Sequence, residues 1–282
     1  MILSVRDDFD LEKIADSGQC FRWERKADTK TVRILHASSC LYITPLGRDR
    51  YELTCSSEEY ELIWKEYFDL KEDYGRIRAR IDPASDPFLW AACEQEKGIR
   101  ILRQDPWEML ITFIISQNKN IPAIRRSVEF LAESCGEKKI DTRGLEYYAF
   151  PTPRAIVSLS DEALKACKLG YRCSYVRHAA EAVAEGKLDL QSLLSADEEC
   201  TLQELTSLYG VGSKVANCIS LFGLHHLDAF PKDVWIKRVL SQEYPEGYPF
   251  AAYSPYNGVY QQYMFAYISQ DHAHSAWLAQ AL

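Results

Sequence analysis

The pattern of apolar residues changes its period near residue 85, and this change limits what the chain can fold into. Before it, short β-branched and aromatic runs at 19–23, 31–36, 40–44 and 50–54 are separated by turn-like segments, as in a sheet. Pro45-Leu46-Gly47 is expected to form the turn between the last two runs. The connections are too short for parallel crossovers, so the pattern predicts antiparallel strands.

Helical signals follow the strands. Ser56 and Glu59 have capping-box spacing ahead of an apolar run, which predicts a helix that covers the sheet. Asp105 and Pro106 resemble an N-cap and a first-turn proline for a helix over 107–117. From residue 85 onward the period stays helical, with further helices expected at 122–134, 161–167, 172–185, 201–209, 213–223, 233–242 and 257–269. We therefore predict an α+β protein, with an antiparallel β-rich domain over 1–85 and a larger all-α domain over 86–282.

Composition removes several classes of protein. No apolar run approaches the ~20 residues of a membrane span, and the acidic N-terminus does not resemble a secretory signal, so we expect a cytoplasmic protein. The nine cysteines are odd in number and scattered, without a C-x-x-C pair, which argues against a disulfide framework or a zinc ribbon. Neither His225-His226 nor Asp271-His272-Ala273-His274 has metal-site spacing.

The net charge of −8 argues against a nucleic-acid binder, because phosphate contacts require cations. The charge is unevenly distributed, however. Residues 100–126 hold five basic and two acidic side chains, a local +3, and residues 205–240 hold four basic and two acidic ones, a local +2. A duplex responds to this local field, so DNA binding remains compatible with the acidic total.

The segment most informative about function is Gly210-Val211-Gly212, which is flanked by two helical segments. Glycines permit a tight turn and the close approach of another backbone, and the following helix N-terminus can bind a phosphate. An ordinary connection between two helices of a bundle explains these three residues equally well.

Lys214 and Asp233 begin successive helices after this turn. A cation in the first turn opposes the helix dipole, so Lys214 is unfavourable for stability and suits a nucleophile, although a solvated lysine that contacts phosphate is the simpler interpretation. Asp233 occupies an N-cap position, and an N-cap aspartate is commonly nothing more. Together, the two residues carry more information than either does alone.

Gly210-Val-Gly-Ser-Lys214 followed by Pro231-Lys-Asp233 resembles the helix-hairpin-helix DNA glycosylases, and within them the 8-oxoguanine DNA glycosylase/lyase branch. Further segments resemble the same family in the same order, over residues ~15 to ~270: Ser17–Trp23, Arg100–Pro106, Ser116–Ile121 and Leu169–Arg172. The resemblance implies a TATA-binding-protein-like N-terminal β domain before the glycosylase domain.

The implied activity is removal of 8-oxoguanine from duplex DNA, preferably opposite cytosine, by base flipping, followed by strand cleavage. Lys214 would attack the sugar C1′ and form a Schiff base that undergoes β-elimination, and Asp233 would stabilise the positive charge on the sugar. Double-stranded DNA is the implied partner. No metal or organic cofactor and no membrane are implied, and we expect a monomer, associated with the nucleoid if the source is prokaryotic.

The resemblance also implies a base pocket. Gly18 would offer its carbonyl to the N7–H of 8-oxoguanine, Gln261 would bind the Watson–Crick edge, and Phe265 and Cys218 would pack on the two faces of the base, with Pro231 beside them. Without the resemblance, Gln261 and Phe265 read as an i, i+4 pair on an amphipathic helix. Cys218 reads equally well as a small core residue.

On the DNA side, Asn118 would fill the gap in the duplex, Tyr171 would wedge into the stack, and Arg172 would bind the orphaned cytosine, while Gly210, Val211 and Gly212 would contact the backbone. Two positions depart from the family. Trp235 replaces a histidine that contacts phosphate, and Ala123 replaces an arginine that reads the opposite cytosine, which predicts weaker discrimination for cytosine.

Two alternatives stay open. A glycosylase/lyase for another oxidised base would have the same hairpin, but many such enzymes carry a four-cysteine cluster near the C-terminus, and this chain has no cysteine after Cys218. A non-catalytic helix-hairpin-helix DNA-binding protein would need Gly210 and Gly212 but neither Lys214 nor Asp233.

Overall fold

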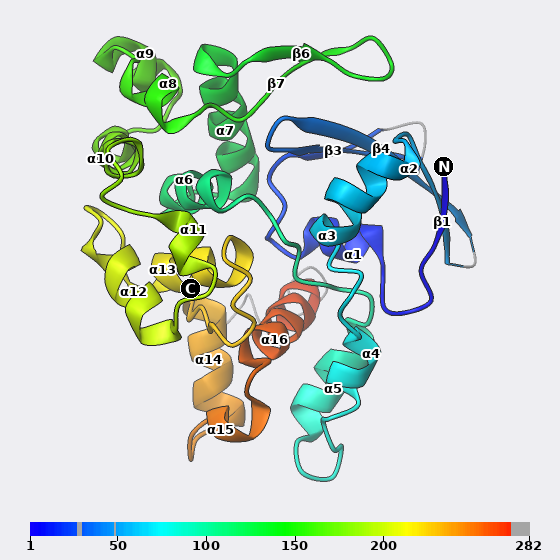
Figure 1. Ribbon diagram of the computed structural model, residues 1–282. Coiled ribbons are helices and arrows are strands. Elements are labelled where there is room, and N and C mark those ends of the chain that lie inside the picture. The colour runs from blue at the N-terminus through cyan, green and yellow to red at the C-terminus, as the bar shows by residue number, and fades with distance from the viewer. Residues whose placement is uncertain (27–29, 48, 272–282) are drawn as a thin grey trace.

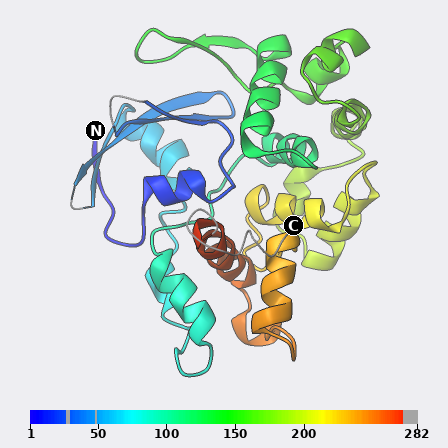
Figure 2. The same ribbon diagram turned by 180° about the vertical axis from the view of Figure 1, so that it is seen from behind.

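The computed structural model describes residues 1–26, 30–47 and 49–271, so His272 and His274 lie outside the described residues. The N-terminal part is a five-stranded antiparallel sheet in the order β1-β5-β4-β3-β2. Its strands are β1 (Ile2–Ser4), β2 (Trp23–Arg25), β3 (Val32–His36), β4 (Ser39–Gly47) and β5 (Arg50–Leu53). The sheet and the helical remainder lie side by side (Figures 1 and 2).

Alternating burial along the strands builds a separate core on one face of the sheet. Ile34 faces Leu41 across β3 and β4, and both are fully buried. Against them pack α1 (Leu11–Asp16) and the continuous helical segment α2 (Ser57–Glu59), η1 (Tyr60–Trp64) and α3 (Lys65–Tyr67). The Ser56 hydroxyl accepts a hydrogen bond of 3.0 Å from the Glu59 N–H, which confirms the predicted cap.

The rest of the described chain is mainly helical, which confirms the predicted fold class. Its helices are α4 (Tyr74–Arg78), α5 (Pro87–Gln95), α6 (Pro106–Ser116), α7 (Ile121–Cys135), α8 (Pro153–Val157), α9 (Asp161–Ala166), α10 (Arg172–Ala184), α11 (Leu190–Leu193), α12 (Glu198–Ser207), α13 (Ser213–Phe222), α14 (Val234–Glu243), α15 (Phe250–Tyr253) and α16 (Asn257–Asp271). Asp105 caps α6 by accepting from the Glu108 N–H at 2.7 Å, as predicted. None of the described helices combines the length and apolar character that a membrane crossing needs.

Several local predictions were wrong. The helical period is interrupted by a hairpin of β6 (Lys138–Ile140) and β7 (Glu146–Tyr148), which reaches back toward the sheet (Figure 1). There Asp141 accepts a 2.7 Å hydrogen bond from the Tyr42 hydroxyl and pairs with Arg33. Pro45-Leu46-Gly47 is not a turn but the end of β4, where a bulge lets Pro45 remain opposite Tyr51.

The loop before β2 was also assigned incorrectly. The expected strand over 19–23 begins only at Trp23, because Gln19 turns inward and its buried amide bonds the backbone of Arg100 and Leu102. Neither β1 nor α1 was predicted, since segments of three and six residues carry too few periodic positions to detect.

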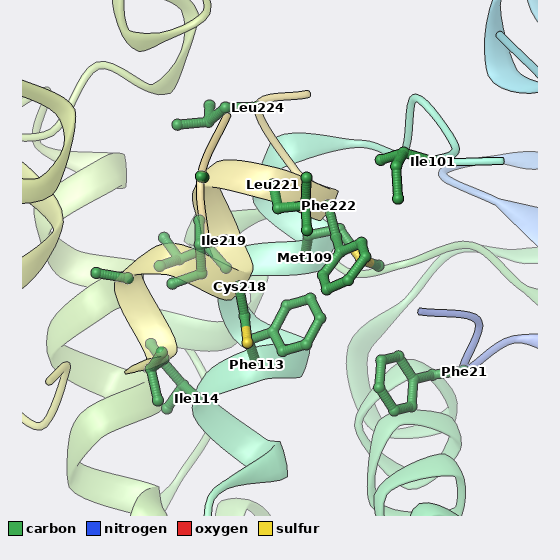
Figure 3. Close-up of a cluster of buried hydrophobic side chains, with 14 of the residues drawn as sticks. Phe21, Ile101, Met109, Phe113, Ile114, Cys218, Ile219, Leu221, Phe222 and Leu224 are labelled. Carbon is green, nitrogen blue, oxygen red and sulfur yellow. The ribbon is translucent and has the colours of Figure 1, made fainter. Parts of the chain in front are cut away.

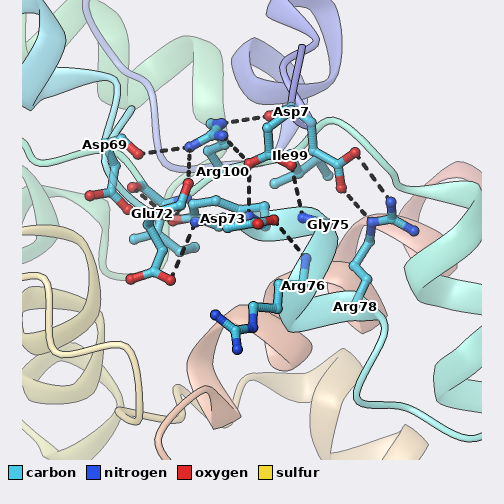
Figure 4. A network of polar contacts seen from close by, with 12 residues as sticks. Asp7, Asp69, Glu72, Asp73, Gly75, Arg76, Arg78, Ile99 and Arg100 are labelled. Carbon is cyan, nitrogen blue, oxygen red and sulfur yellow. Dashed lines mark hydrogen bonds and ion pairs between the residues drawn. The ribbon is translucent and has the colours of Figure 1, made fainter. Parts of the chain in front are cut away.

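A buried arginine joins the two parts of the molecule. Arg100 donates to the carbonyls of Asp8 at 2.5 Å and Asp69 at 2.7 Å, and it pairs with Asp7 (Figure 4). Tyr74 and Ile77, although N-terminal to residue 85, pack in the core of the helical part. The two cores therefore interlock, and a domain boundary at residue 85 stays a prediction.

Candidate active site

The glycine-containing turn joins α12 to α13, as the sequence predicts. Gly210 has φ +83°, and a Cβ on it would lie 2.3 Å from the ring of Tyr175 on α10. The Gly210 carbonyl accepts a 3.0 Å hydrogen bond from Gln117, and the Val211 side chain is buried. Glycine is therefore required at 210 by both conformation and space.

Gly212 has a different role. Its φ is −96°, and a Cβ there would meet no atom within 4 Å. It is the N-cap of α13, and no side chain caps that helix. The first N–H groups of α13 are thus available at the positive end of the helix dipole, which is the arrangement that binds a phosphate.

Lys214 and Asp233 line one small cavity, from the first turn of α13 and the start of α14. Asp233 accepts a 2.8 Å hydrogen bond from the Ile236 N–H and so caps α14. Burial raises the pKa of the Asp233 carboxyl, while the helix N–H groups and the charges of Lys214 and Lys237 oppose that rise. The geometry places an amine and a partly desolvated carboxylate at the same opening.

The cavity also contains every residue assigned to the base pocket: Gly18, Cys218, Pro231, Gln261 and Phe265. They come from the loop after α1 and from α13, the loop before α14, and α16. Gly18 has φ +83°, and a Cβ on it would meet the Phe265 ring at 3.3 Å. A side chain at residue 18 would therefore strain the backbone and push the Phe265 ring by a few tenths of an ångström.

Gln261 is 4% exposed, and only one of the two polar atoms of its side-chain amide has a hydrogen-bond partner among the described residues. Its amide nitrogen donates to the Pro231 carbonyl at 3.2 Å, whereas its amide oxygen, Oε1, has no partner among the described residues. A buried acceptor without a donor is unfavourable, and a guest with N–H groups would satisfy it.

Cys218 faces the cavity one turn after Lys214. Burial raises the pKa of its thiol to about 11, although the nearby Lys214 ammonium opposes that rise, so the thiol is neutral at pH 7. Figure 3 shows its sulfur beside the Phe113 ring of α6. Phe113 in turn stacks on Phe222, with ring centroids 5.4 Å apart. This side of the cavity is therefore flat and apolar.

Four residues of the cavity were not predicted from the sequence: Ser17, Phe113, Phe222 and Gln262. Phe113 and Phe222 sit inside apolar helices, where nothing distinguishes them from core residues. Gln262 donates to the Ser17 carbonyl, and so it holds the Gly18 loop against α16. A second glutamine beside Gln261, within the largely apolar stretch 259–268 of α16, was the available signal.

The three residues expected to enter the duplex do not share one environment. Asn118 is exposed with φ +50°, and Tyr171 is 55% exposed, so both can reach a ligand. Arg172 is only 5% exposed, and its guanidinium donates to the carbonyls of Gln117, Asn118 and Leu169. Its donors are thus used by the protein's own backbone, and a role of Arg172 in reading the orphaned cytosine stays a prediction.

The structure also shows where the two residues that depart from the family pattern, Trp235 and Ala123, are located. Trp235 is half-buried and packs against the helical core, and Ala123 lies in the first turn of α7. Within the described part of the chain, no three His, Cys, Asp or Glu side chains are grouped to hold a metal ion.

Residues 1–110 match the family model of the 8-oxoguanine DNA glycosylase N-terminal domain, and residues 111–245 match the HhH-GPD superfamily of base excision DNA repair proteins. A structure of MBOgg1 with a low-affinity DNA ligand is 34% identical, with a TM-score of 0.89, and the match covers 96% of each chain. The chain belongs to the 8-oxoguanine DNA glycosylase family.

Other family members support the assignment. The Clostridium acetobutylicum 8-oxoguanine glycosylase/lyase, in complex with DNA that has cytosine opposite 8-oxoG, is 32% identical with a TM-score of 0.86; the match covers 96% of this chain and 98% of that one. The N-glycosylase/DNA lyase of Saccharomyces cerevisiae is 37% identical over 52% of this chain and 42% of its own length. The matches to the first three curated relatives span 42–64% of those proteins.

Proposed function

We propose that this protein is a bifunctional DNA glycosylase and AP lyase that removes 8-oxoguanine from duplex DNA, preferably opposite cytosine. The observation that carries the proposal is the convergence of Lys214, Asp233 and the unsatisfied Gln261 amide in one cavity. A binding module would have no need of an amine and a desolvated carboxylate beside an unpaired buried amide oxygen at the same opening.

The proposed chemistry begins with the neutral amine of Lys214, which attacks C1′ of the flipped nucleotide. The C1′–N9 bond breaks, and the departing base takes up a proton. The ionised Asp233 stabilises the oxocarbenium-like charge on the sugar. The C1′–O4′ bond then opens as O4′ takes up a solvent proton, which leaves the lysine nitrogen joined to C1′ as a protonated Schiff base. This Schiff base acidifies the C2′ proton, and loss of that proton expels the 3′ oxygen as phosphate and cleaves the strand.

Recognition of the base uses the rest of the cavity. The free Gln261 oxygen accepts from the N1–H and N2–H groups of the guanine ring, and Phe265 and Cys218 pack on its two faces. The Gly18 carbonyl accepts the N7–H that distinguishes 8-oxoguanine from guanine. A guanine without that hydrogen would leave this carbonyl unpaired, at a cost of about 1–3 kcal/mol.

The duplex is held from outside the cavity. The N–H groups at Gly212 bind the backbone, Asn118 occupies the gap left by the flipped base, and Tyr171 wedges into the stack. The protein acts as a monomer without a metal or organic cofactor, in the cytoplasm, and at the nucleoid if the source is prokaryotic. The Pro231 carbonyl fixes the Gln261 amide in its reading orientation.

Borohydride trapping tests the proposal. A duplex with one 8-oxoguanine opposite cytosine should give a covalent adduct with the protein, and Lys214→Gln should abolish the adduct while DNA binding persists. Lys165→Gln, at an exposed lysine on α9 that does not line the cavity, is the matched control and should retain it.

Two results would contradict the proposal. Tight binding by the unaltered protein without any adduct would indicate a non-catalytic DNA-binding protein. Adducts formed only with oxidised pyrimidines would indicate a lyase for a different base.

A further inference from the structure

The structure also contains a cavity that is larger than the base pocket. A cavity of about 530 Å³, hereafter the sheet–α7 cavity, lies between β2, β3 and α7. Its apolar wall includes Phe21, Trp23 and Leu35, and its polar wall includes Arg22, Arg33 and Arg125. This volume is in the range of cavities that bind small organic ligands.

Three arginines that border the cavity have unsatisfied donors. The Nη1 group of Arg22 and the Nε groups of Arg33 and Arg125 are buried and have no hydrogen-bond partner among the described residues. The Arg22 side chain is only 2% exposed, and its other donors are held by Glu129 and the Tyr148 carbonyl. Buried guanidinium N–H groups without acceptors indicate a place for an anionic oxygen.

The charges of the lining residues define the ligand more narrowly. Four arginines line the cavity, including Arg25, and three of the four have carboxylate partners. Arg22 pairs with Glu129, Arg25 with Asp16, and Arg33 with Glu24 and Asp141. Arg125 has no carboxylate partner in the described structure. A single negative charge matches this one unpaired arginine, and a phosphodiester carries one, whereas a free nucleoside monophosphate carries about two at pH 7.

The position of the cavity connects it to the DNA-binding face. Phe21 lines it and also packs edge-to-face on Phe113, which lines the base pocket, with ring centroids 5.7 Å apart. Arg125 lies one turn beyond Ile121, where α7 begins just after the exposed Asn118. A duplex engaged by Asn118 therefore passes near this helix.

We propose that the sheet–α7 cavity is a second DNA-binding site, in which Arg125, with Arg22 and Arg33, binds a backbone phosphodiester while the attached nucleotide lies against Phe21 and Leu35. The inference rests on the proposed function only in taking DNA as the ligand. It adds to that function a backbone contact made jointly by the N-terminal sheet and α7.

The test measures equilibrium binding of a lesion-containing duplex in the Lys214→Gln background, over a range of salt concentrations. Arg125→Ala should weaken binding about tenfold and lower the slope of log K against log salt by about 0.9, the value for one lost phosphate contact. The neighbouring Arg126→Ala is the matched control, because Arg126 is exposed and does not line the cavity. It should change binding less than twofold.

Methylphosphonate linkages locate the contact. Replacing the phosphate that Arg125 contacts by a neutral linkage should weaken binding to the parent protein about tenfold. The same replacement should not weaken binding to Arg125→Ala any further, because in a double-mutant cycle two changes that remove one contact are not additive. Equal losses in Arg125→Ala and Arg126→Ala would overturn the proposal, because α7 would then act only through its general charge.

A free nucleotide is the other source of the same chemistry. If 5′-dAMP bound the parent protein but not Arg125→Ala, while both bound the duplex equally, the assignment to DNA would be overturned. Because these measurements are of binding alone, they stand even if borohydride trapping finds no lyase activity.

Discussion

Arg172 at the start of α10 holds the loop that carries Asn118. Its guanidinium donates to the Gln117 carbonyl at 2.7 Å and to the Asn118 carbonyl at 3.2 Å, and it lies over the Tyr171 ring with 4.3 Å to the centroid. Arg172, which the family resemblance assigns to the orphaned cytosine, thus positions Asn118, the residue proposed to fill the gap in the duplex. Support of the Asn118 loop and binding of the orphaned cytosine predict different effects of replacing Arg172.

Arg172→Ala should lower the free energy of unfolding by about 2–4 kcal/mol, because it leaves several buried carbonyls without donors. Activity on 8-oxoguanine should fall by the same factor opposite C, T, G and A, since the Asn118 loop serves all four substrates. Arg172→Lys, which keeps the charge but not the planar fork, should recover part of the stability. Denaturant titration and single-turnover cleavage measure both effects. A loss confined to cytosine would instead support a reading role.

Ala123 predicts weak selection of the opposite base. A bidentate arginine contact is worth about 1–3 kcal/mol of discrimination, and neither Ala123 nor the buried Arg172 supplies one. Cleavage opposite C should therefore exceed cleavage opposite T by less than about tenfold. Ala123→Arg should increase the ratio at least about fivefold, and Ala123→Gln, which adds length without charge, should not. A steep preference for C in the unaltered protein would show that another residue reads the base.

Replacing each of the two hairpin glycines by alanine should affect a different property, stability for Gly210 and DNA binding for Gly212. Gly210→Ala should lower the free energy of unfolding by about 2–4 kcal/mol, because φ is +83° and the Cβ would overlap the Tyr175 ring. Gly212→Ala should leave stability nearly unchanged, since its φ is negative and its Cβ position is empty, yet it should weaken DNA binding by crowding the N–H groups of α13. Thermal unfolding and duplex titration on both variants separate the two roles. Equal destabilisation would contradict this assignment.

The sequence predicted those features that depend on neighbouring residues. The caps at Ser56, Asp105 and Asp233 were found because an N-cap is specified within four residues. The burial of Arg172 could not be found in this way, since two of its three acceptors, Gln117 and Asn118, lie more than fifty positions away in the sequence. Phe113 was missed for a related reason. It differs from other core phenylalanines only in which cavity it lines.

Asp233 combines two roles that asparagine can separate. Asp233→Asn keeps an oxygen for the Ile236 N–H and removes a charge that burial disfavours, so stability should change by less than about 0.5 kcal/mol. The glycosylase rate should nevertheless fall about 100-fold or more, because no carboxylate remains to stabilise the charge on the sugar. Asp197→Asn, at the N-cap of α12 outside the cavity, is the control and should keep full activity. Full activity of Asp233→Asn would remove Asp233 from the mechanism.

Glu108 should make the fold less stable as the pH rises. Its buried carboxyl accepts a 3.2 Å hydrogen bond from the Ala37 N–H, and burial raises its pKa from 4.5 to about 8 despite the opposing charge of Arg22. Between these two values the folded state keeps a proton that the unfolded state has lost, so the free energy of unfolding decreases as pH rises, by at most about 1.4 kcal/mol per pH unit.

Glu108→Gln removes this titration while keeping an oxygen for the Ala37 N–H. Denaturant unfolding at pH 5, 6.5 and 8 should therefore show a smaller loss of stability toward alkaline pH in Glu108→Gln than in the parent, with the two proteins differing most at pH 8. Other groups titrate as well, so the contribution of Glu108 is given by the difference in the free energy of unfolding between the two proteins at each pH. Parallel pH profiles would show that Glu108 is already ionised in the fold, held by Arg22 across the contact between the sheet and α6.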